Sequence, residues 1–148
     1  MKYADLSVSH DSEYTFDFDR MLALTGNTGP YLQYASARIR SMFRKAGLSP
    51  EETVDDIVLT EEAERALALV LLRFGGVVEQ VGRTYEPHRL CGYLFDVAQT
   101  FTTFYERCPV LRAEEATVRA SRLALSSATL AVLVQGLRLL GITAPEQM

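Results

Sequence analysis

Histidine and cysteine are both scarce in this sequence, with two of each in 148 residues. His10 and His88 have no acid, thiol or serine at the spacing of a catalytic motif, which argues against an enzyme that uses a general base or a nucleophile. Cys91 and Cys108 fit no metal-ligand spacing and are too few for a disulfide framework. We therefore expect no catalytic residue and no metal site, and we expect both cysteines to be reduced thiols in the core.

The sequence also lacks an excess of positive charge and a long apolar run. Its formal net charge is −4, which excludes a protein that coats nucleic acid through overall positive charge but leaves a local basic face open. No apolar run approaches the roughly 20 residues that span a bilayer, and residues 1–5 have neither part of a signal peptide. We expect a soluble, cytoplasmic protein with no membrane contact.

Segments with the two-residue period of a β-strand are lacking too, and residues 2–7 are the only stretch that we expect to be extended or irregular. What the sequence has instead is the three-and-four spacing of amphipathic helices. Its length is that of one domain, which buries roughly two-thirds of the surface of its unfolded chain. We predict one all-α domain over residues 1–148, a bundle of about five to six helices.

Prolines and glycines mark where the predicted helices begin and end. One helix opens at Pro30, where the absent N–H costs nothing, and ends at Gly47. Another opens at Pro87 and ends before Pro109. The last covers about residues 113–140 and ends at the glycine that follows. The apolar positions predicted to form the core are Leu32, Ala35, Ile39, Met42, Phe43, Ala46, Ala63, Leu67, Val70, Leu71, Phe74, Leu90, Leu94, Val97, Phe101, Phe104, Cys108, Leu123, Leu130, Leu133, Val134, Leu137 and Leu140.

Side-chain caps and a glycine pair complete the pattern. Ser49 and Glu52 form a capping box that begins a short helix or turn. Thr60 caps the next helix, whose first turn is acidic and so complements the positive end of the helix dipole. Gly75 and Gly76 interrupt the periodicity of that helix, which resumes at residue 77. We therefore expect a break or kink between two helices that face the same core.

Three polar or aromatic residues follow Pro30 at helical spacing. Tyr31, Tyr34 and Arg38 are three and four positions apart, so on a helix they share one face beside the apolar stripe. Tyrosine rings can stack on unpaired bases and arginine can pair with phosphates, while Arg40 and Arg44 add positive charge on a neighbouring face. Residue types alone favour the plainer interpretation, in which the tyrosines pack at the rim of a bundle and Arg38 is solvated or ion-paired.

The segment "GNTGPYLQYASARIRSM", residues 26–42, resembles the segment that opens the DALR-type anticodon-binding domain of bacterial arginyl-tRNA synthetases. "KYADLS" and "YTFDFDRMLAL", near the start, resemble the junction with the catalytic domain, so residues 1–25 correspond to that junction. "PHRLCGYLFDVAQTFTTFYERCPVL" resembles the middle helix, and "RLALSSATLAVLVQGLRLLGITAPEQM" resembles the C-terminal helix and tail. The resemblance covers nearly the whole chain in order, and the chain stops where the family stops.

The resemblance implies an all-helical, tRNA-binding domain that holds the anticodon loop of arginine-accepting tRNA. The positions that it assigns to the anticodon site are Tyr31, Tyr34, Arg38, Phe101, Tyr105 and Met148. In the family the two YLQYA tyrosines lie against anticodon bases and the terminal methionine lies near the same loop. By residue type alone, the middle-helix aromatics Phe101 and Tyr105 are more typical of a core.

The resemblance also implies what the chain does not contain. The catalytic domain of these synthetases, with its HIGH-type signature and KMSK-like loop, is absent, so ATP and arginine would bind only to another domain. We expect no enzyme activity and no cofactor in this chain alone, and we expect as partners tRNA and either a synthetase catalytic domain or another protein. A fragment and a free-standing copy both fit. The alternative function is a helical adaptor that keeps the fold but binds a protein partner; the presence of Tyr31, Tyr34, Arg38 and Met148 favours RNA.

Overall fold

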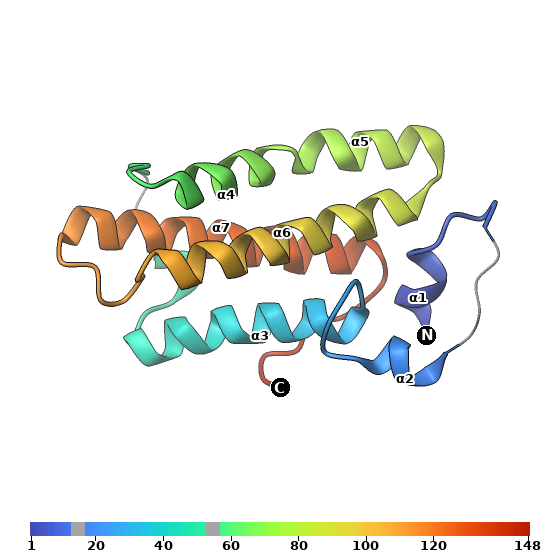
Figure 1. The fold of residues 1–148 in the computed structure, drawn as a ribbon, viewed down its shortest axis with the longest axis horizontal. Helices are drawn as coiled ribbons and strands as arrows, with labels where there is room; N and C mark the ends of the chain where they lie inside the picture. Colours follow the sequence, from blue (N-terminus) through green and yellow to red (C-terminus); the bar gives the residue numbers. More distant parts are fainter. Residues whose placement is uncertain (13–16, 53–56) are drawn as a thin grey trace.

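The computed structural model describes residues 1–12, 17–52 and 57–148, and these ranges contain helices and loops but no strand (Figure 1). The all-α bundle predicted from the sequence is confirmed. Five of the α-helices in the described ranges have at least 11 residues and two have five. In chain order the elements are α1 (Lys2–Leu6), α2 (Phe18–Leu22), α3 (Gly29–Ala46), the 3₁₀ helix η1 (Pro50–Glu52), α4 (Glu62–Leu72), α5 (Phe74–Thr84), α6 (Pro87–Arg107) and α7 (Ala116–Leu139).

Helix α6 lies at the centre of the bundle and contacts α1, α3, α4, α5 and α7 (Figure 1). In the figure α4 and α5 run along one side of α6, α3 runs along the other, and α7 lies behind. The predicted stripe of α6 is buried throughout: Leu90, Leu94, Val97, Phe101, Phe104 and Cys108. Because α6 packs against neighbours on every side but one, it has a single exposed strip, and α3 and α4 border that strip.

The predicted bounds of α3 are confirmed. Thr28 is its N-cap, and the Thr28 hydroxyl accepts the N–H of Tyr31 at 3.2 Å. Pro30 lies in the first turn, and Gly47 ends the helix with a φ of 66°, a left-handed conformation that glycine adopts without a Cβ penalty. These local signals fix where α3 begins and therefore where Tyr31 lies on it. The short helix predicted after Ser49 is η1; the Glu52 side chain of its capping box lies outside the described residues.

The start of α4 and the break after it differ from the prediction by one or two residues. The N-cap is Glu61 and not Thr60, because the Glu64 carboxylate reaches back and accepts the N–H groups of both Glu61 (2.9 Å) and Thr60 (2.7 Å). The predicted break is confirmed, but it falls at Arg73, before the glycine pair, which lies in the first turn of α5. Helix α5 faces the same core with half-buried residues and buries none completely.

The extended or irregular conformation predicted for residues 2–7 is wrong, because Lys2–Leu6 form α1 and Ser7 is its C-cap. A five-residue helix is too short to show a period and too short to be stable alone. Tertiary contacts hold it: the buried Tyr3 donates its hydroxyl hydrogen bond to Asn27 Oδ1 (2.5 Å) or to the Cys91 carbonyl (3.1 Å). The junction-like segment is thereby packed on α6 and on the loop before α3.

Helix α7 begins at Ala116, three residues later than predicted, and ends at Leu139. The predicted glycine stop, Gly141, follows the C-cap Leu140 and has a φ of 68°. In the described part of the chain, α7 is the one helix long and apolar enough to cross a membrane, which the sequence reasoning did not expect. However, 61% of its most apolar stretch is buried inside the bundle, as in the core helix of a globular domain. Both cysteines are free and buried, as predicted, and burial raises the pKa of Cys91 to about 12.

Candidate nucleic-acid interface

The first turn of α3 carries Tyr31 to the edge of the exposed strip of α6. Its half-buried ring meets Phe95 of α6 edge to face, with ring centroids 5.7 Å apart. Beside Tyr31 a hollow of about 550 Å³ opens between α4 and α6, lined by the small side chains Ala63 and Ala66 and by a row of hydroxyl and amide side chains, Gln99, Thr100, Thr102 and Thr103. Part of the Tyr31 ring is therefore committed to packing, as the plainer interpretation expects.

Tyr34 lies one turn further along the same face of α3 and is 42% exposed. The structure gives Tyr34 no ring contact with another described residue. An aromatic ring open to solvent on a rigid helix offers a stacking surface at little entropic cost. Tyr34 is the more accessible of the two tyrosines.

Arg38 stacks its guanidinium on the ring of Tyr105, with Cζ 4.9 Å from the ring centroid. Arg38 remains exposed to solvent, as the plainer interpretation expects, and the cation–π contact adds a partner that residue type alone does not predict. The contact joins α3 to α6 and leaves the edges of the guanidinium, which carry the N–H donors, open to an acceptor. A planar cation held in this way is suited to a phosphate or to a base edge.

Phe101 lies beneath this pair. It is only 4% exposed, and its ring centroid is 6.0 Å from that of Tyr105 and 5.8 Å from that of Phe104. The Phe101 ring therefore presents almost no surface of its own. In this conformation Phe101 can act on a bound RNA only through the residues that it packs against, of which Tyr105 is one.

The chain beyond Gly141 runs back along α3, and the C-terminus lies beside that helix (Figure 1). Three α3 side chains donate to its carbonyl groups: Gln33 to Thr143 O (2.6 Å), Arg40 to Pro145 O (2.8 Å) and Arg44 to Glu146 O (3.2 Å). These contacts bring the exposed Met148 to the side of α3. The sequence pattern placed positive charge at Arg40 and Arg44 but did not indicate the segment that they bind.

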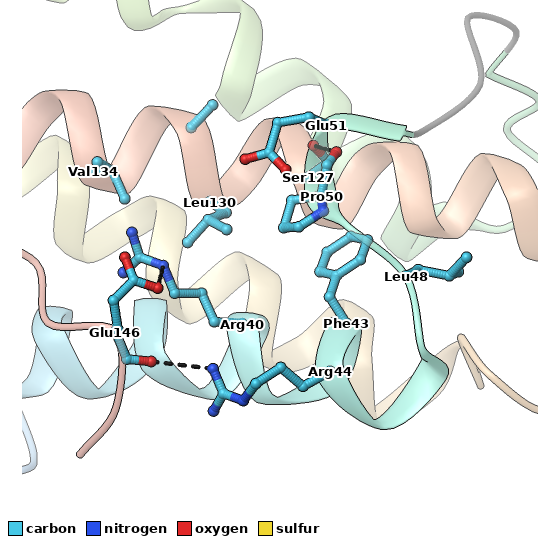
Figure 2. A pocket seen from close by; sticks show the side chains of 11 residues that line it. Arg40, Phe43, Arg44, Leu48, Pro50, Glu51, Ser127, Leu130, Val134 and Glu146 are labelled. Atoms are coloured by element: carbon cyan, nitrogen blue, oxygen red, sulfur yellow. Dashed lines mark hydrogen bonds and ion pairs between the residues drawn. The ribbon is translucent and has the colours of Figure 1, made fainter.

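Between α3, η1, α7 and the tail there is a second hollow, of about 460 Å³ (Figure 2). Its floor is apolar, with Phe43, Leu130 and Val134, and two arginines and two glutamates stand around it. A hydrogen bond from the Ser49 hydroxyl holds the pKa of one of these glutamates, Glu51, below its usual range. Two positive and two negative side chains balance one another, so the hollow has no net charge with which to attract a phosphate.

Of the six residues predicted for the site, four are brought together, whereas Phe101 is buried beneath them and Met148 lies at the end of the tail beside α3. Helix α3 carries Tyr31, Tyr34 and Arg38, and the Arg38 contact adds Tyr105 from α6. Sequence reasoning missed Phe95 and Gln33, which hold Tyr31 and the tail. Gln33 had a detectable signal: it is seven and eleven positions before Arg40 and Arg44, on one helix face. Among the described residues, no group of three or more His, Cys, Asp or Glu side chains could hold a metal ion.

A family model described as the DALR anticodon binding domain matches residues 32–148 of the chain. Over all 148 residues the chain is 69% identical to an arginine-tRNA ligase of Thermobifida fusca (strain YX) and 57% identical to one of Frankia casuarinae. The chain spans only about a quarter of these relatives, 26% and 25% of their lengths.

Solved structures agree with these matches. The arginyl-tRNA synthetase of Plasmodium falciparum superimposes with a TM-score of 0.89 at 37% identity, over 99% of this chain and 26% of that one. The arginyl-tRNA synthetase of Thermus thermophilus gives a TM-score of 0.81 at 39% identity, over 90% of this chain and 23% of that one. The helical bundle is thus similar to one part of much longer proteins.

Proposed function

Because this chain belongs to the DALR anticodon binding domain family, we propose that it binds the anticodon stem-loop of a tRNA that accepts arginine. The observation that carries the proposal is the arrangement on α3 and α6: an exposed tyrosine, Tyr34, stands one turn from an arginine that is stacked on Tyr105. Single-stranded RNA loops are recognised by stacking of splayed bases on aromatic rings and by cationic contacts to the backbone. The relatives that match the whole chain carry the name arginine-tRNA ligase, which supplies the tRNA species.

Each site residue has a distinct role in this proposal. Tyr34 stacks on an unpaired base, and Tyr31 supplies a second ring whose position the Phe95 contact fixes. Arg38 holds a phosphate while Tyr105 and, beneath it, Phe101 keep the guanidinium in place. Met148, brought alongside α3 by the tail, borders the same loop.

The joining of arginine to tRNA belongs to the remaining three quarters of the arginine-tRNA ligases that the chain matches. We propose that ATP and arginine bind there, that the chain alone joins no arginine to tRNA, and that the protein acts in the cytoplasm. Residues 1–148 act as one domain, with residues 1–25 as the junction, because Tyr3 packs the first helix into the core. The alternative of a protein-binding adaptor has no support in the comparisons, whose whole-length matches are arginine-tRNA ligases.

The test of the proposed function is equilibrium binding to a tRNA that accepts arginine, beside the same tRNA with its central anticodon base changed. We expect tighter binding to the unaltered tRNA at both low and physiological salt. The net charge of −4 means that the overall field does not assist, so affinity is modest and falls with salt. Equal binding to both tRNAs, or none, would show that the fold serves another partner.

Substituting Tyr34 by alanine is expected to weaken binding of the cognate anticodon stem-loop by about 1–3 kcal/mol, the range for one base stacked on an aromatic side chain. The measurement is a fluorescence or calorimetric titration at fixed salt. Tyr85→Asn is the matched control, because Tyr85 is more exposed than Tyr34, lies at the far end of α5 and has a φ of 55°, which asparagine tolerates. Unchanged affinity of the Tyr34 variant would exclude the stacking role.

Arg38→Gln is expected to change how binding depends on salt. If Arg38 holds one phosphate, its loss lowers the slope of log K against log salt concentration by about 0.7, the value per phosphate of a single strand. Titrations of wild type and variant at four or more salt concentrations give this slope. Arg119→Gln, which removes an exposed arginine from the start of α7, is the control and is expected to leave the slope as it is; an equal change in both variants would rule out a specific contact at Arg38.

A further inference from the structure

The chain after α7 satisfies its carbonyl groups through side chains, because it forms no helix or strand. Gly141 turns the chain out of α7, and the carbonyls of residues 141, 143, 145 and 146 then accept hydrogen bonds from side chains of α1 and α3. Lys2 donates a hydrogen bond to Gly141 O at 2.9 Å. Gln33 donates to Thr143 O, and Arg40 donates to Pro145 O. The segment 142–148, here called the tail, is therefore held at several points along its length.

Arg40 makes the most extensive of these contacts. Its side chain is only 15% exposed; Nη1 donates to Pro145 O at 2.8 Å while Nε lies 3.3 Å from the Glu146 carboxylate. Figure 2 shows that Glu146 is held twice, since Arg44 Nη1 also reaches its carbonyl oxygen at 3.2 Å. Both guanidinium groups, which the sequence pattern assigned to a basic face, are engaged by the tail of the same chain.

The main-chain contacts matter more here than the ion pair. The Glu146 carboxylate is 81% exposed, and an ion pair with so exposed a partner is weak and screened by salt. Hydrogen bonds from a guanidinium to a carbonyl are stronger, and they depend on the planar fork that presents two donors at a fixed angle. A lysine at position 40 keeps the charge but cannot reproduce that fork.

The arginines that hold the tail, Arg40 and Arg44, here called the clamp, lie on the same helix as Tyr34 and Arg38. One stripe of α3 carries Gln33 and, seven and eleven positions later, Arg40 and Arg44. Tyr34 and Arg38 lie on the other border of the solvent-facing surface of the helix. The tail leaves the clamp on the solvent side of α3, where the C-terminus lies in Figure 1. The tail and the aromatic side chains therefore lie on the two sides of the solvent-facing surface of α3.

We propose that Arg40 and Arg44 are positioning residues that clamp the tail against α3, so that the tail and Met148 form one wall of the RNA site. They hold no phosphate themselves. This proposal rests on the proposed function for its RNA part, whereas the clamp is a property of the free protein and can be measured without RNA.

The first experiment is NMR of the Met148 methyl group in the free protein. Arg40→Ala and Arg40→Lys are both expected to move this signal to the random-coil position and narrow it, while the ring signals of Tyr34 stay where they are. Arg44→Ala, at an exposed position, gives a second variant that removes one hydrogen bond without disturbing a buried side chain. Arg119→Ala is the matched control. A Met148 signal that is unchanged in all three clamp variants would overturn the clamp.

The second experiment is RNA binding as a function of salt. Arg40→Ala and Met148→Ala are each expected to lower affinity for the cognate stem-loop by about tenfold. Arg40→Ala loses a charge-assisted hydrogen bond to the tail, and Met148→Ala removes the apolar side chain that borders the RNA. The double variant is expected to be no weaker than the poorer single one, and the salt slope of Arg40→Ala equals that of wild type. A slope lowered by about 0.7, with effects that multiply, would make Arg40 a phosphate contact and overturn the proposal.

The outcomes separate the two proposals. If wild type prefers the cognate anticodon and Arg40→Ala or Met148→Ala binds as wild type does, the proposed function stands and the tail wall is refuted. If wild type binds no RNA, the proposed function and the RNA part fall together, and the methyl signal alone decides whether the tail is clamped.

Discussion

Replacing Arg122 by alanine is expected to destabilise the protein by about 3–5 kcal/mol, the usual cost of removing one partner of a buried ion pair. The Arg122 side chain is 10% exposed and Glu64, its partner, is fully buried, with Nε and Oε1 2.6 Å apart. Arg122 also donates to the Pro109 carbonyl at 3.0 Å, so its loss leaves a buried carboxylate uncompensated and loosens the loop between α6 and α7. Urea unfolding at pH 7 measures the change.

The control for this variant is an ion pair on the surface. Arg83 pairs with Glu79 four positions earlier on α5, with both side chains mostly exposed. Arg83→Ala is therefore expected to change stability by about 0.5 kcal/mol or less. If Arg122→Ala were as mild as Arg83→Ala, the Glu64 carboxylate would have to be compensated by other groups.

The same pair predicts how stability depends on pH. Burial opposes ionisation of Glu64, but hydrogen bonds from Glu61, Arg122 and Thr60 outweigh it and hold the pKa of Glu64 below its usual value. A group whose pKa is lowered by folding contributes stability above its unfolded pKa, about 4.3 for glutamate, and loses it as the pH falls through the folded pKa. The difference in free energy of unfolding between wild type and Glu64→Gln should therefore be largest at pH 7 and shrink below about pH 4.

Gly136→Ala is expected to destabilise the protein by about 3 kcal/mol, at the upper end of the cost of overpacking a core. Gly136 lies inside α7, where it is buried against α6. A Cβ atom at this position falls 2.9 Å from Leu94 Cδ1 and closer still to Cδ2, and Leu94 is itself fully buried. The two helices must separate or Leu94 must leave its rotamer, which outweighs the roughly 1 kcal/mol that alanine gains over glycine in a helix.

Two companion variants make the cause identifiable. Gly92 lies inside α6 with nothing within 4 Å of the position of a Cβ, so Gly92→Ala is expected to be neutral or stabilising in the same assay. Leu94→Ala removes the atoms that clash, so adding Gly136→Ala to it should cost far less than adding it to wild type. Fully additive effects in that double-mutant cycle would mean that the clash is not the reason for the loss.

The candidate site shows how far residue patterns reach. That Tyr31, Tyr34 and Arg38 share a face follows from helical spacing, and the spacing of Gln33, Arg40 and Arg44 is equally regular. The partners of these side chains are another matter. Tyr105 is 67 positions from Arg38 in the chain, and Pro145 is 105 positions from Arg40, where no local pattern connects them. Helical spacing therefore predicts which residues share a face of a helix, and tertiary packing determines which residues that face contacts.

The helices themselves were determined locally. A proline and a capping threonine set the start of α3, glycines end α3 and α7, and the three-and-four period of apolar residues names the buried faces, because each of these effects acts within one or two turns. The same periodicity correctly indicated an all-α bundle.

Tertiary structure decided the rest. Helix α1 exists because Tyr3 finds partners in two distant segments, and Glu64 is buried because Arg122 meets it 58 positions later. Arg40 and Arg44 of α3 donate hydrogen bonds to the tail. In each case the local sequence allows a polar or charged side chain to be either exposed to solvent or paired with another group. Its actual state depends on which remote group reaches it when the bundle closes, since the cost of burying a polar group is removed only by a partner in place.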